Sequence, residues 1–427
     1  MTVGKELYGL VAELYPLCRS ITGDGVRQTL RIIGRELGGG LQVHEVPTGT
    51  RVLDWTVPKE WNLRDAWVTD PAGRRVIDLA DSNLHVVSYS RPVDATMPLA
   101  ELKRHLFTLP EHPDWIPYRT SYYTQGWGLC ASQRLADRLP EGPYRVRIDA
   151  TLTDGSLTYG EHFIQGESSQ EVLVSCHVCH PSLANDNLSG IAVATHLAKR
   201  LAQSRRRYSY RLLFVPGTIG SVTWLALNEP HLDRIKHGLV LACVGDPGPL
   251  TYKRSRHGQA GIDRAMEYVL QRSGRPHRVV DFEPYGYDER QYCSPGFNLP
   301  VGSLSRTPYA RYPQYHTSAD DLDLVRPEAL ADTLEACWDL VGVLEADRCY
   351  RNLEPKGEPQ LGRRGLYGPI GGRSDAEERQ LAMLWVLNQS DGHHSLLDIA
   401  HRSGLPFALI AETATTLQDA GLLTASW

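Results

Sequence analysis

The sequence has no uninterrupted run of about 18 apolar residues, the length that a membrane-spanning helix requires. Its 45 basic and 50 acidic side chains leave a formal net charge of only −5, which argues against a whole-protein surface for nucleic acid or anionic membranes. The first 18 residues lack a basic segment followed by a continuous apolar core, so no signal peptide is expected. We therefore expect a cytoplasmic protein with neither a membrane partner nor a nucleic-acid partner.

A disulfide framework is also missing. The eight cysteines are dispersed over 427 residues, a usage typical of reduced thiols. The pair Cys176 and Cys179 has no second Cys-x-x-Cys pair at the spacing of a zinc ribbon, so packing at a strand end is favoured over a redox or structural-zinc role. The composition, 41% hydrophobic and 22% charged, is ordinary for a globular protein, and the length predicts two or three domains.

The most informative stretch is 171–190, EVLVSCHVCHPSLANDNLSG. It opens with a short apolar run that suits a buried strand, although periodicity alone does not separate such a run from a buried helix segment. His177, Cys179 and His180 follow this run, and Asp186 comes after a short loop. A helical pattern, IAVATHLAKRLA, then begins, with apolar residues recurring on one face.

Imidazoles and a carboxylate thus meet at the C-terminal end of a predicted strand, directly before a predicted helix. Open α/β sheets place their ligand sites at this end of the strands. Neutral imidazole together with carboxylate is a ligand set that suits zinc. A histidine alone at a strand end is more often a hydrogen-bonded structural side chain, so the metal prediction depends on the combination.

Three segments carry a resemblance to a known family: CHPSLANDNLSG at 179–190, DERQYCSPG at 288–296 and YHTSADDL at 315–322. Together they resemble bacterial aminopeptidase-like domain proteins, which are related to the zinc-dependent exopeptidases of the leucyl aminopeptidase and glutaminyl cyclase type. The resemblance runs from RSITGDGVRQTL at 19–30 to the last residue. It implies an α/β fold with a zinc-exopeptidase-like, mostly parallel sheet flanked by helices, an inserted small β-rich domain and a C-terminal winged-helix domain.

The order of the predicted elements fits this architecture. After 171–190, strand and helix patterns alternate, as in a mostly parallel sheet that is covered on both faces. From about residue 54 the composition shifts to tryptophan, turn signals and short alternating runs such as 84–90, which predicts a small all-β unit. We place the catalytic domain, the inserted β-rich domain, a Gly/Pro-rich linker and the winged helix at 1–53 with 135–350, 54–134, 351–374 and 375–427.

The inserted unit contains an aromatic segment, 116–130, with Tyr118, Tyr122, Tyr123 and Trp127. An aromatic core that fills a small β domain is the favoured interpretation. The alternative is a wall of the active-site cleft, since a domain inserted before the catalytic strands must lie near them.

The segment 375–427 has three helical patterns and a final strand, which together predict a winged helix. DNA binding is the obvious function of such a module, but the segment carries two arginines against seven carboxylates. A DNA-binding domain needs Lys and Arg to contact the phosphates. We therefore expect a packing or protein-contact module, which favours a homodimer.

The resemblance implies a set of metal ligands. In the exopeptidases, the Asp of the Asp-Asn-x-Ser-Gly motif bridges two metals, and this residue corresponds to Asp186. The later strand-end Asp and the distal His correspond to Asp246 and His316. For the first His, we favour His180 of the CHPS motif, with His177 facing the substrate or supporting the site. The implied cofactor is zinc, as one or two ions.

One position departs from the family pattern. The exopeptidases have a Glu pair, general base and ligand, after the next strand, and the aminopeptidase-like relatives often show Glu in a Pro-Glu-Thr-Ile-Gly-Ser turn. Here the turn at 216–221 reads Pro-Gly-Thr-Ile-Gly-Ser. Gly217 can neither coordinate a metal nor accept a proton. Three outcomes are open: the site holds one zinc ion, another carboxylate serves as the base, or hydrolysis has been lost.

Replacement carboxylates are present in the segment 286–296, GYDERQYCSPG. A general base must lie within reach of the attacking water and have a pKa suited to its task. Glu289 is the predicted base, and Asp288 is the second predicted catalytic residue, as a ligand or an orienting group. An exposed, ion-paired turn is an equally good explanation for either residue alone.

Four further residues are predicted to contact the substrate. Arg290 can hold a carboxylate bidentately. Tyr292 and Tyr315 can donate hydrogen bonds to the oxyanion of a tetrahedral intermediate, although tyrosines at such places are as often packing residues. His177 completes this set if His180 is the metal ligand.

The leading hypothesis is a zinc-dependent hydrolase of the aminopeptidase type, in which metal-bound water attacks an amide bond of a small peptide or aminoacyl compound. The substrate class follows from the resemblance alone. Two alternatives stay open. The first is a non-hydrolytic binding protein on the same scaffold, which Gly217 supports. The second is a winged-helix regulator, which the acidic tail opposes.

Overall fold

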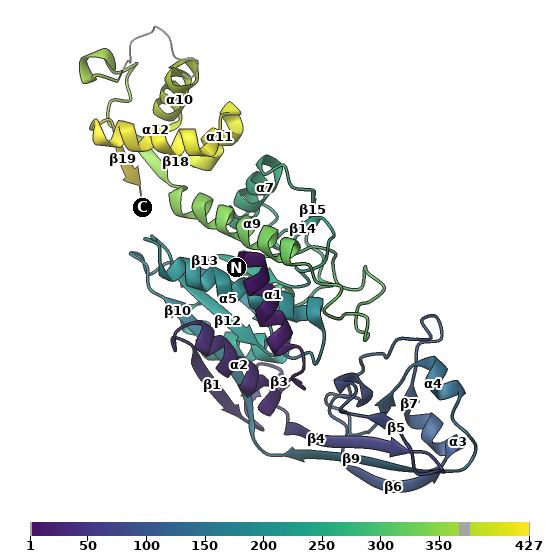
Figure 1. Ribbon diagram of the computed structural model, residues 1–427. Helices are drawn as coiled ribbons and strands as arrows, with labels where there is room; N and C mark the ends of the chain where they lie inside the picture. Colours follow the sequence, from purple (N-terminus) through teal and green to yellow (C-terminus); the bar gives the residue numbers. More distant parts are fainter. Residues whose placement is uncertain (1, 367–375, 427) are drawn as a thin grey trace. The chain divides into compact units, whose positions relative to one another are not determined.

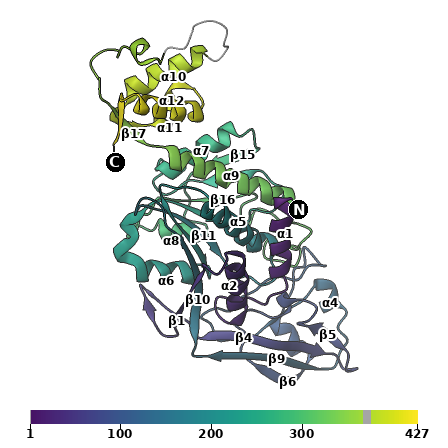
Figure 2. The same ribbon diagram turned by 60° about the vertical axis from the view of Figure 1, so that its left-hand side comes forward.

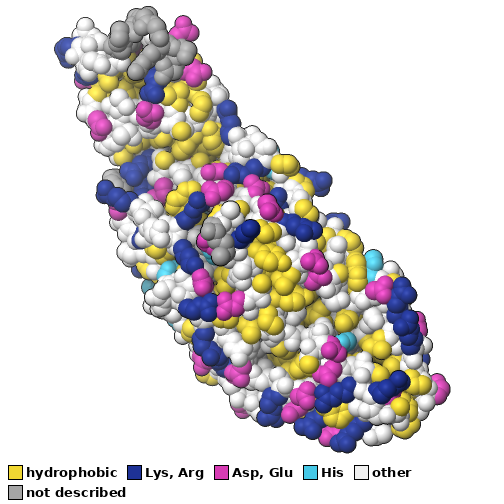
Figure 3. All heavy atoms as spheres, viewed as in Figure 1, with side chains coloured by type: hydrophobic (Ala, Val, Ile, Leu, Met, Phe, Trp, Pro, Cys, Tyr) yellow, Lys and Arg dark blue, Asp and Glu magenta, His cyan; other side chains and the backbone are white. Residues whose placement is uncertain are grey.

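The computed structural model describes residues 2–366 and 376–426 (Figure 1). The chain forms two compact units, Met1–Asp263 with Leu270–Cys337, and Arg264–Val269 with Trp338–Trp427. Among the described helices, none combines the length and hydropathy that a membrane span needs. On the face drawn in Figure 3, Lys and Arg side chains are interspersed with Asp and Glu, in keeping with the small net charge of −5.

The first unit is built on an eight-stranded sheet with the order β1-β10-β12-β11-β13-β16-β14-β15. The four middle strands run parallel, whereas β10 and β14 pair antiparallel with their inner neighbours. All seven residues of β11 are buried, which explains the apolar run at its centre. The bounds are Gln42–Pro47 (β1), Ser156–Ile164 (β10), Glu171–His177 (β11), Ser209–Val215 (β12), Ile235–Leu241 (β13), Leu250–Lys253 (β14), His277–Val280 (β15) and Val301–Ser305 (β16).

Helices cover both faces of this sheet. Figure 2 shows α6 and α8 on one side and α1, α2 and α5 on the other. Ten of the thirteen residues of α5 are buried, because this helix packs directly behind the central strands. The predicted α/β sheet flanked by helices is therefore confirmed. The bounds are Val3–Leu14 (α1), Asp24–Glu36 (α2), Gly190–Ala202 (α5), Ile219–Asn228 (α6), Gly261–Arg272 (α7), Glu289–Tyr292 (α8) and Pro327–Ala346 (α9).

A four-stranded antiparallel sheet, with the order β5-β4-β9-β6, forms the inserted β-rich part of the same unit. Its strand β9 leads through a short turn into β10 of the large sheet, so the insert is joined directly to that sheet. The bounds are Glu60–Thr69 (β4), Arg75–Asp78 (β5), Val93–Pro98 (β6) and Pro143–Thr153 (β9). Shorter elements are Arg51–Val52 (β2), Trp55–Thr56 (β3), Leu99–Leu102 (α3), Leu106–Phe107 (β7), Leu129–Cys130 (β8) and Gln133–Asp137 (α4).

The predicted strand at 84–90 is wrong. The chain there forms a 3-10 turn at Asn83–His85 and then an irregular segment. The Ser90 hydroxyl donates to the Val87 carbonyl at 2.6 Å, a local bond that competes with a strand ladder. Tyr89 has φ = 70°, which breaks the extended backbone that the alternating sequence pattern predicted.

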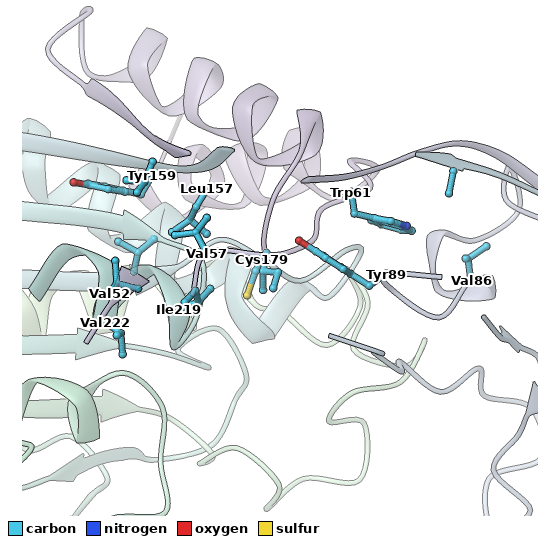
Figure 4. Close-up of a cluster of buried hydrophobic side chains, with 14 of the residues drawn as sticks. Val52, Val57, Trp61, Val86, Tyr89, Leu157, Tyr159, Cys179, Ile219 and Val222 are labelled. Atoms are coloured by element: carbon cyan, nitrogen blue, oxygen red, sulfur yellow. The ribbon is translucent and has the colours of Figure 1, made fainter. Parts of the chain in front are cut away.

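One buried hydrophobic cluster continues from the large sheet into the insert. Figure 4 shows Val57, Leu157 and Ile219 in the part near the large sheet, with Trp61 and Tyr89 extending the cluster into the insert. The rings of Trp61 and Tyr89 stack with their centroids 5.8 Å apart. Continuous apolar burial of this kind fixes the insert against the sheet that carries the candidate site.

The second unit contains a three-stranded antiparallel sheet, β18-β17-β19, together with α10, α11 and α12. Helix α11 starts with a capping box in which Ser395 and Asp398 each bond the other's backbone N–H. This arrangement confirms the predicted winged helix, whose sheet begins ahead of residue 375. The residues 367–374 of the predicted linker lie outside the described residues. The bounds are Cys349–Asn352 (β17), Ala376–Gln389 (α10), Asp391–Ser395 (β18), Leu396–Ser403 (α11), Phe407–Asp419 (α12) and Leu423–Ser426 (β19).

Candidate metal centre

Asp186 lies at the centre of three histidines. Its Oδ1 atom is 2.8 Å from His177 Nε2, and its Oδ2 atom is 3.0 Å from His316 Nε2. The centroid of the His180 ring lies 4.8 Å from that of His177 and 5.1 Å from that of His316. The ligand atoms of His177, His180 and Asp186 all lie within 4.8 Å of one another, the clustering that a metal ion requires.

The end of β11 and the loop after it supply three of these four groups. His177 is the last residue of β11, and His180 lies in the loop that follows. Asp186 lies in the helical turn Ala184–Ser189, directly before α5. The position matches the rule that open α/β sheets bind ligands at the carboxyl ends of their strands.

The fourth group, His316, comes from the loop before α9. Its backbone has φ = 56°, a left-handed conformation that non-glycine residues adopt rarely. Its side chain is 33% exposed, whereas the side chains of His177 and Asp186 are 1% and 2% exposed. The cluster is therefore reached from the His316 side.

Burial sets the charge states in the cluster. Burial lowers the pKa of His180 well below its usual value, which keeps this imidazole neutral. For Asp186, burial opposes ionisation, but the histidines around it, including hydrogen bonds from His177 and His316, outweigh burial and hold the pKa of this carboxyl well below its usual range. A neutral imidazole and an ionised carboxylate are the forms that coordinate zinc, so the donor set fits that metal.

The carboxylate of Asp320, which the sequence analysis did not single out, holds the backbone of the segment that carries Asp186. Its Oδ1 atom accepts the backbone N–H of Asn185 at 2.6 Å, and its Oδ2 atom accepts that of Asp186 at 3.1 Å. Burial raises the pKa of Asp320 to about 8, and the nearby Asp186 acts in the same direction. The YHTSADDL motif contains Asp320, but the sequence does not reveal which of its two adjacent Asp residues faces inward.

Arg19, in the N-terminal segment, holds the backbone of His180. Its Nε atom donates to the His180 carbonyl at 2.9 Å, and its Nη1 atom donates to the Leu14 carbonyl at 2.6 Å. The side chain is fully buried, and burial lowers the pKa of Arg19 to about 10. The RSITGDGVRQTL segment thus has a definite place in the site, although no role was predicted for it.

The predicted ligand Asp246 is not part of the cluster. Its carboxylate accepts hydrogen bonds from Thr307 N at 3.0 Å, Thr307 Oγ1 at 2.6 Å, Gly248 N at 2.8 Å and Asn185 Nδ2 at 3.2 Å. Strand β13 ends at Leu241, so Asp246 lies in the loop beyond it rather than at the expected strand end. These four donors engage both of its oxygens.

The predicted base Glu289 is held in an ion pair. Its Oε1 atom lies 2.5 Å from Lys253 Nζ. Its carboxylate also accepts the backbone N–H of Tyr287 at 3.1 Å and the hydroxyl of Tyr309 at 3.3 Å. Glu289 is fully buried, so these contacts leave little room for it to accept a further proton.

Asp288, the second predicted catalytic residue, has a different environment. Its Oδ1 atom accepts Thr218 N at 2.8 Å and Ser221 Oγ at 2.9 Å. Its buried Oδ2 atom has no hydrogen-bond partner among the described residues. Burial raises the pKa of Asp288 to about 6. Asp288 thus combines a free oxygen with a pKa that suits a general base, and it does so at the 216–221 turn, where the family pattern has Glu.

The predicted substrate contacts have different positions. Tyr315 stacks on His316 with the ring centroids 3.9 Å apart, at the exposed side of the cluster. Tyr292 is fully buried, and its hydroxyl lies 2.9 Å from Ser175 Oγ, which matches the packing alternative. Arg290 is exposed on α8, with no side-chain partner within the described ranges.

Two more tyrosines line the cluster. The ring of Tyr118 lies edge-on to His180 and to His316, at centroid distances of 5.2 Å and 5.1 Å. The backbone N–H of Tyr118 also donates to the His316 carbonyl at 2.8 Å. The insert therefore contributes to the wall of the site, as the alternative interpretation of 116–130 held. Tyr287 lies against His177, with the ring centroids 3.7 Å apart.

Residues 8–347 match a family described as a domain of unknown function, DUF4910. The chain belongs to the DUF4910 family. Residues 348–425 match the winged helix-turn-helix family. A Clostridium acetobutylicum protein, provisionally named for polysaccharide biosynthesis and for an aminopeptidase-like domain, is 52% identical over 420 residues, which cover 98% of this chain and 96% of the relative.

Solved structures support the fold of this DUF4910 member. A crystal structure from Clostridium acetobutylicum, provisionally described as a peptidase, matches with a TM-score of 0.93 and 50% identity, covering 99% of this chain and 96% of that one. The zinc aminopeptidase BSAP from Bacillus subtilis matches with a TM-score of 0.58 and 14% identity, covering 80% and 94%. At that identity the likeness shows the fold alone, and it confirms the predicted aminopeptidase-like architecture.

Proposed function

We propose that this protein is a metal-dependent hydrolase that cleaves an amide bond of a small peptide or aminoacyl compound. The observation that carries the proposal is the convergence of three imidazoles, from His177, His180 and His316, on the buried Asp186 carboxylate. Few structural roles require three buried or half-buried histidines around one carboxylate, whereas catalytic zinc sites use this kind of donor set.

We assign the metal to these four residues, with His177 and His180 both available as ligands. His177, His180 and Asp186 form one cluster, and His316 bonds the second oxygen of Asp186. Gly217 offers no ligand, and the oxygens of Asp246 accept hydrogen bonds from Thr307. These features favour one zinc ion over two. When bound, the ion would supply Lewis acidity toward a carbonyl oxygen and toward water.

The proton transfers are assigned to Asp288 rather than Glu289. The free Oδ2 atom of Asp288 would accept the proton of the attacking water and return it to the departing amine. Thr218 N and Ser221 Oγ hold the other oxygen and fix the orientation of the carboxylate. Glu289 would instead position the segment, through its bonds to Lys253 and Tyr287 N.

The aromatic side chains would form the walls. Tyr118 and Tyr315 contact the exposed imidazole of His316, and a substrate must pass them to reach the cluster. Such walls exclude water and strengthen the interactions inside. The substrate class is taken from the Bacillus subtilis zinc aminopeptidase, whose fold this chain shares.

Metal content and amide hydrolysis test the proposal together. Purified protein is analysed for zinc by elemental analysis, and activity is measured on a panel of aminoacyl p-nitroanilides before and after treatment with a chelator. We expect about one equivalent of zinc and activity that the chelator abolishes and added zinc restores. Protein with less than about half an equivalent of any divalent metal after zinc incubation would overturn the proposal.

Gly217 supports a second candidate, a binding protein that kept the scaffold and lost hydrolysis. This candidate predicts zinc binding without turnover of any p-nitroanilide. The Asp288→Asn variant separates the two. A hydrolase loses about 10²–10⁴-fold in activity when its base is removed, whereas a binding protein shows no turnover before or after the substitution.

A further inference from the structure

A cavity of about 680 Å³ lies over one face of the edge strands β16, β14 and β15. The strand register places Thr251 beside Ser305 and Arg278, and Lys253 beside Ser303. Side chains alternate between the faces of a sheet, so these five residues share the face that forms the floor. The volume lies in the range of small-molecule sites in proteins, about 300–1,000 Å³.

The floor offers free hydroxyl groups. Thr251 and Ser303 are 5% and 3% exposed, and both line the cavity. Neither hydroxyl has a hydrogen-bond partner in the part of the chain that the structure describes. A hydroxyl both donates and accepts, so this floor suits a ligand that carries hydroxyl groups of its own.

The rim carries positive charge that the protein leaves unpaired. Lys253 and Arg306 also line the cavity, but they pair with Glu289 and with Asp332 at 2.5 Å and 3.0 Å. Arg278 and Arg311 are exposed and have no acidic partner among the described residues. Unpaired guanidinium groups over a concave polar floor are typical of sites that bind a carboxylate or a phosphate.

The negative charge at the cavity is smaller. Asp281 pairs with Arg254, and Glu283 is the remaining carboxylate in the lining. Two unpaired arginines therefore face one unpaired carboxylate. The local excess of positive charge favours an anionic ligand over a neutral or cationic one.

Two residues of the cavity lining bond carboxylates next to the candidate active site. Tyr309 lines the cavity, and its hydroxyl donates to Glu289, next to Asp288. Thr307 also lines the cavity and bonds Asp246 with its hydroxyl at 2.6 Å. The Tyr309 hydroxyl thus links the cavity lining to Glu289, the neighbour of Asp288 in the sequence.

We propose that this cavity binds an anionic, polyhydroxylated small molecule, with Arg278 and Arg311 on its carboxylate or phosphate and Thr251 and Ser303 on its hydroxyl groups. As the site of one part of the substrate, it rests on the proposed hydrolase function, and it makes that substrate an acidic sugar-like amide rather than a plain peptide. The binding itself does not depend on hydrolysis, so the two proposals can fail separately.

Calorimetric titration of the full-length protein tests the inference with three probes: glucuronate, glucose 1-phosphate and uncharged glucose. We expect at least one anionic probe to bind ten-fold or more tightly than glucose. Preference between glucuronate and glucose 1-phosphate identifies carboxylate or phosphate as the recognised group. Equal or weaker binding of both anionic probes relative to glucose would overturn the proposal.

Variants locate the binding. We expect Arg278→Ala and Arg311→Ala each to lower the affinity for the preferred anionic probe ten-fold or more. Ser303→Ala is expected to lower this affinity less. The matched control is Arg31→Ala, an exposed arginine on α2 outside the cavity, which should bind as the unaltered protein does. Unchanged affinity in both cavity variants would place the anion elsewhere and refute the assignment.

A parallel activity measurement keeps this inference distinct from the hydrolase proposal. Hydrolysis of a neutral aminoacyl p-nitroanilide by the unaltered protein is measured beside its binding of the anionic probes, with Arg31→Ala as the control variant for both. Anion binding without any hydrolysis would refute the hydrolase and keep the cavity assignment. Hydrolysis without anion binding would refute the cavity assignment and keep the hydrolase proposal.

Discussion

The hydroxyl of Tyr287 fills the space in which a side chain at position 217 would lie. A Cβ atom built on Gly217 would stand 2.0 Å from Tyr287 Oη and 2.5 Å from its ring carbon Cζ. Tyr287 also lies against His177, and its hydroxyl is 3.5 Å from Cys179 Sγ. The missing glutamate and the position of this tyrosine are therefore coupled, and the tyrosine belongs to the wall of the metal centre.

The first prediction concerns this pair. Gly217→Ala should destabilise the protein by about 1–3 kcal/mol, because Tyr287 must move to accommodate the methyl group. Urea unfolding measures the change. The control is Gly9→Ala on α1, where nothing lies within 4 Å of the added methyl and the helix should gain up to about 1 kcal/mol. A Gly217→Ala protein that is as stable as the unaltered one would contradict this account.

The second prediction concerns the metal ligands. His180→Ala and Asp186→Ala should each remove most of the bound zinc, because each deletes a donor from the cluster. Asp246→Asn should keep a full complement, because Asp246 bonds Thr307 and Gly248 instead. Elemental analysis after zinc loading gives the result. Loss of zinc in Asp246→Asn would restore Asp246 as a ligand, as the family pattern implies.

The third prediction concerns the support of Asp186. Asp320→Asn should weaken zinc affinity about 10–100-fold, because an amide cannot accept both backbone N–H groups that Asp320 now accepts. The adjacent Asp321→Asn is the control, since its carboxylate bonds only local backbone of the same loop. Competition with a zinc indicator measures both. Equal affinity in the two variants would assign Asp320 no part in the metal centre.

The local part of the site could be predicted from the sequence, because it follows the order of the chain. The predicted strand is followed along the chain by His177, His180 and Asp186 and then by the predicted helix. The hydrophobic periodicity and the motif therefore placed these three residues at the end of one strand. The role of Asp246 could not be predicted, because it depends on where β13 ends and on Thr307, which is 61 residues away. Spacing predicts which residue types approach a site, but not which oxygens are already engaged.

The roles of the remaining site residues depend on contacts that form only in the folded protein. Asp288 and Glu289 are adjacent in the sequence, and nothing local distinguishes a base from an ion-paired partner. Lys253 engages Glu289, and this contact exists only in the folded protein. The supporting residues Asp320 and Arg19 were missed for the same reason, since their partners lie more than 100 residues away.

The fourth prediction concerns the winged helix. The part of this domain within 375–427 carries two arginines against seven carboxylates, so that part should repel the phosphates of DNA. We expect no retention of a random 30-base-pair duplex in a gel shift at about 50 mM salt, where non-specific contacts are strongest. The positive control is a basic winged-helix protein on the same gel. A salt-sensitive shift by this protein would revive the regulator hypothesis.

The fifth prediction concerns pH and Asp288. Burial, with Glu289 acting in the same direction, raises the pKa of Asp288 to about 6, while His177, Thr218 N and Ser221 oppose the shift. A base must be ionised to accept a proton, so kcat/KM should rise about ten-fold per pH unit below pH 6 and level off above it. The Asp288→Asn variant should lose most of the activity, and its kcat/KM should no longer show this rise below pH 6.

The same group makes stability depend on pH with a definite sign. Asp288 has a higher pKa in the folded protein than the ordinary value of 3.8, so the folded state binds more protons than the unfolded state between about pH 4 and pH 6. Its contribution to the free energy of unfolding therefore falls as pH rises through that window, by about 3 kcal/mol. Urea unfolding at pH 4, 5, 6 and 7 should show a steeper decline for the unaltered protein than for Asp288→Asn, which cannot ionise. Parallel stability profiles for the two proteins would mean that Asp288 is already ionised at low pH, and the assignment of Asp288 as the base would then lose its physical basis.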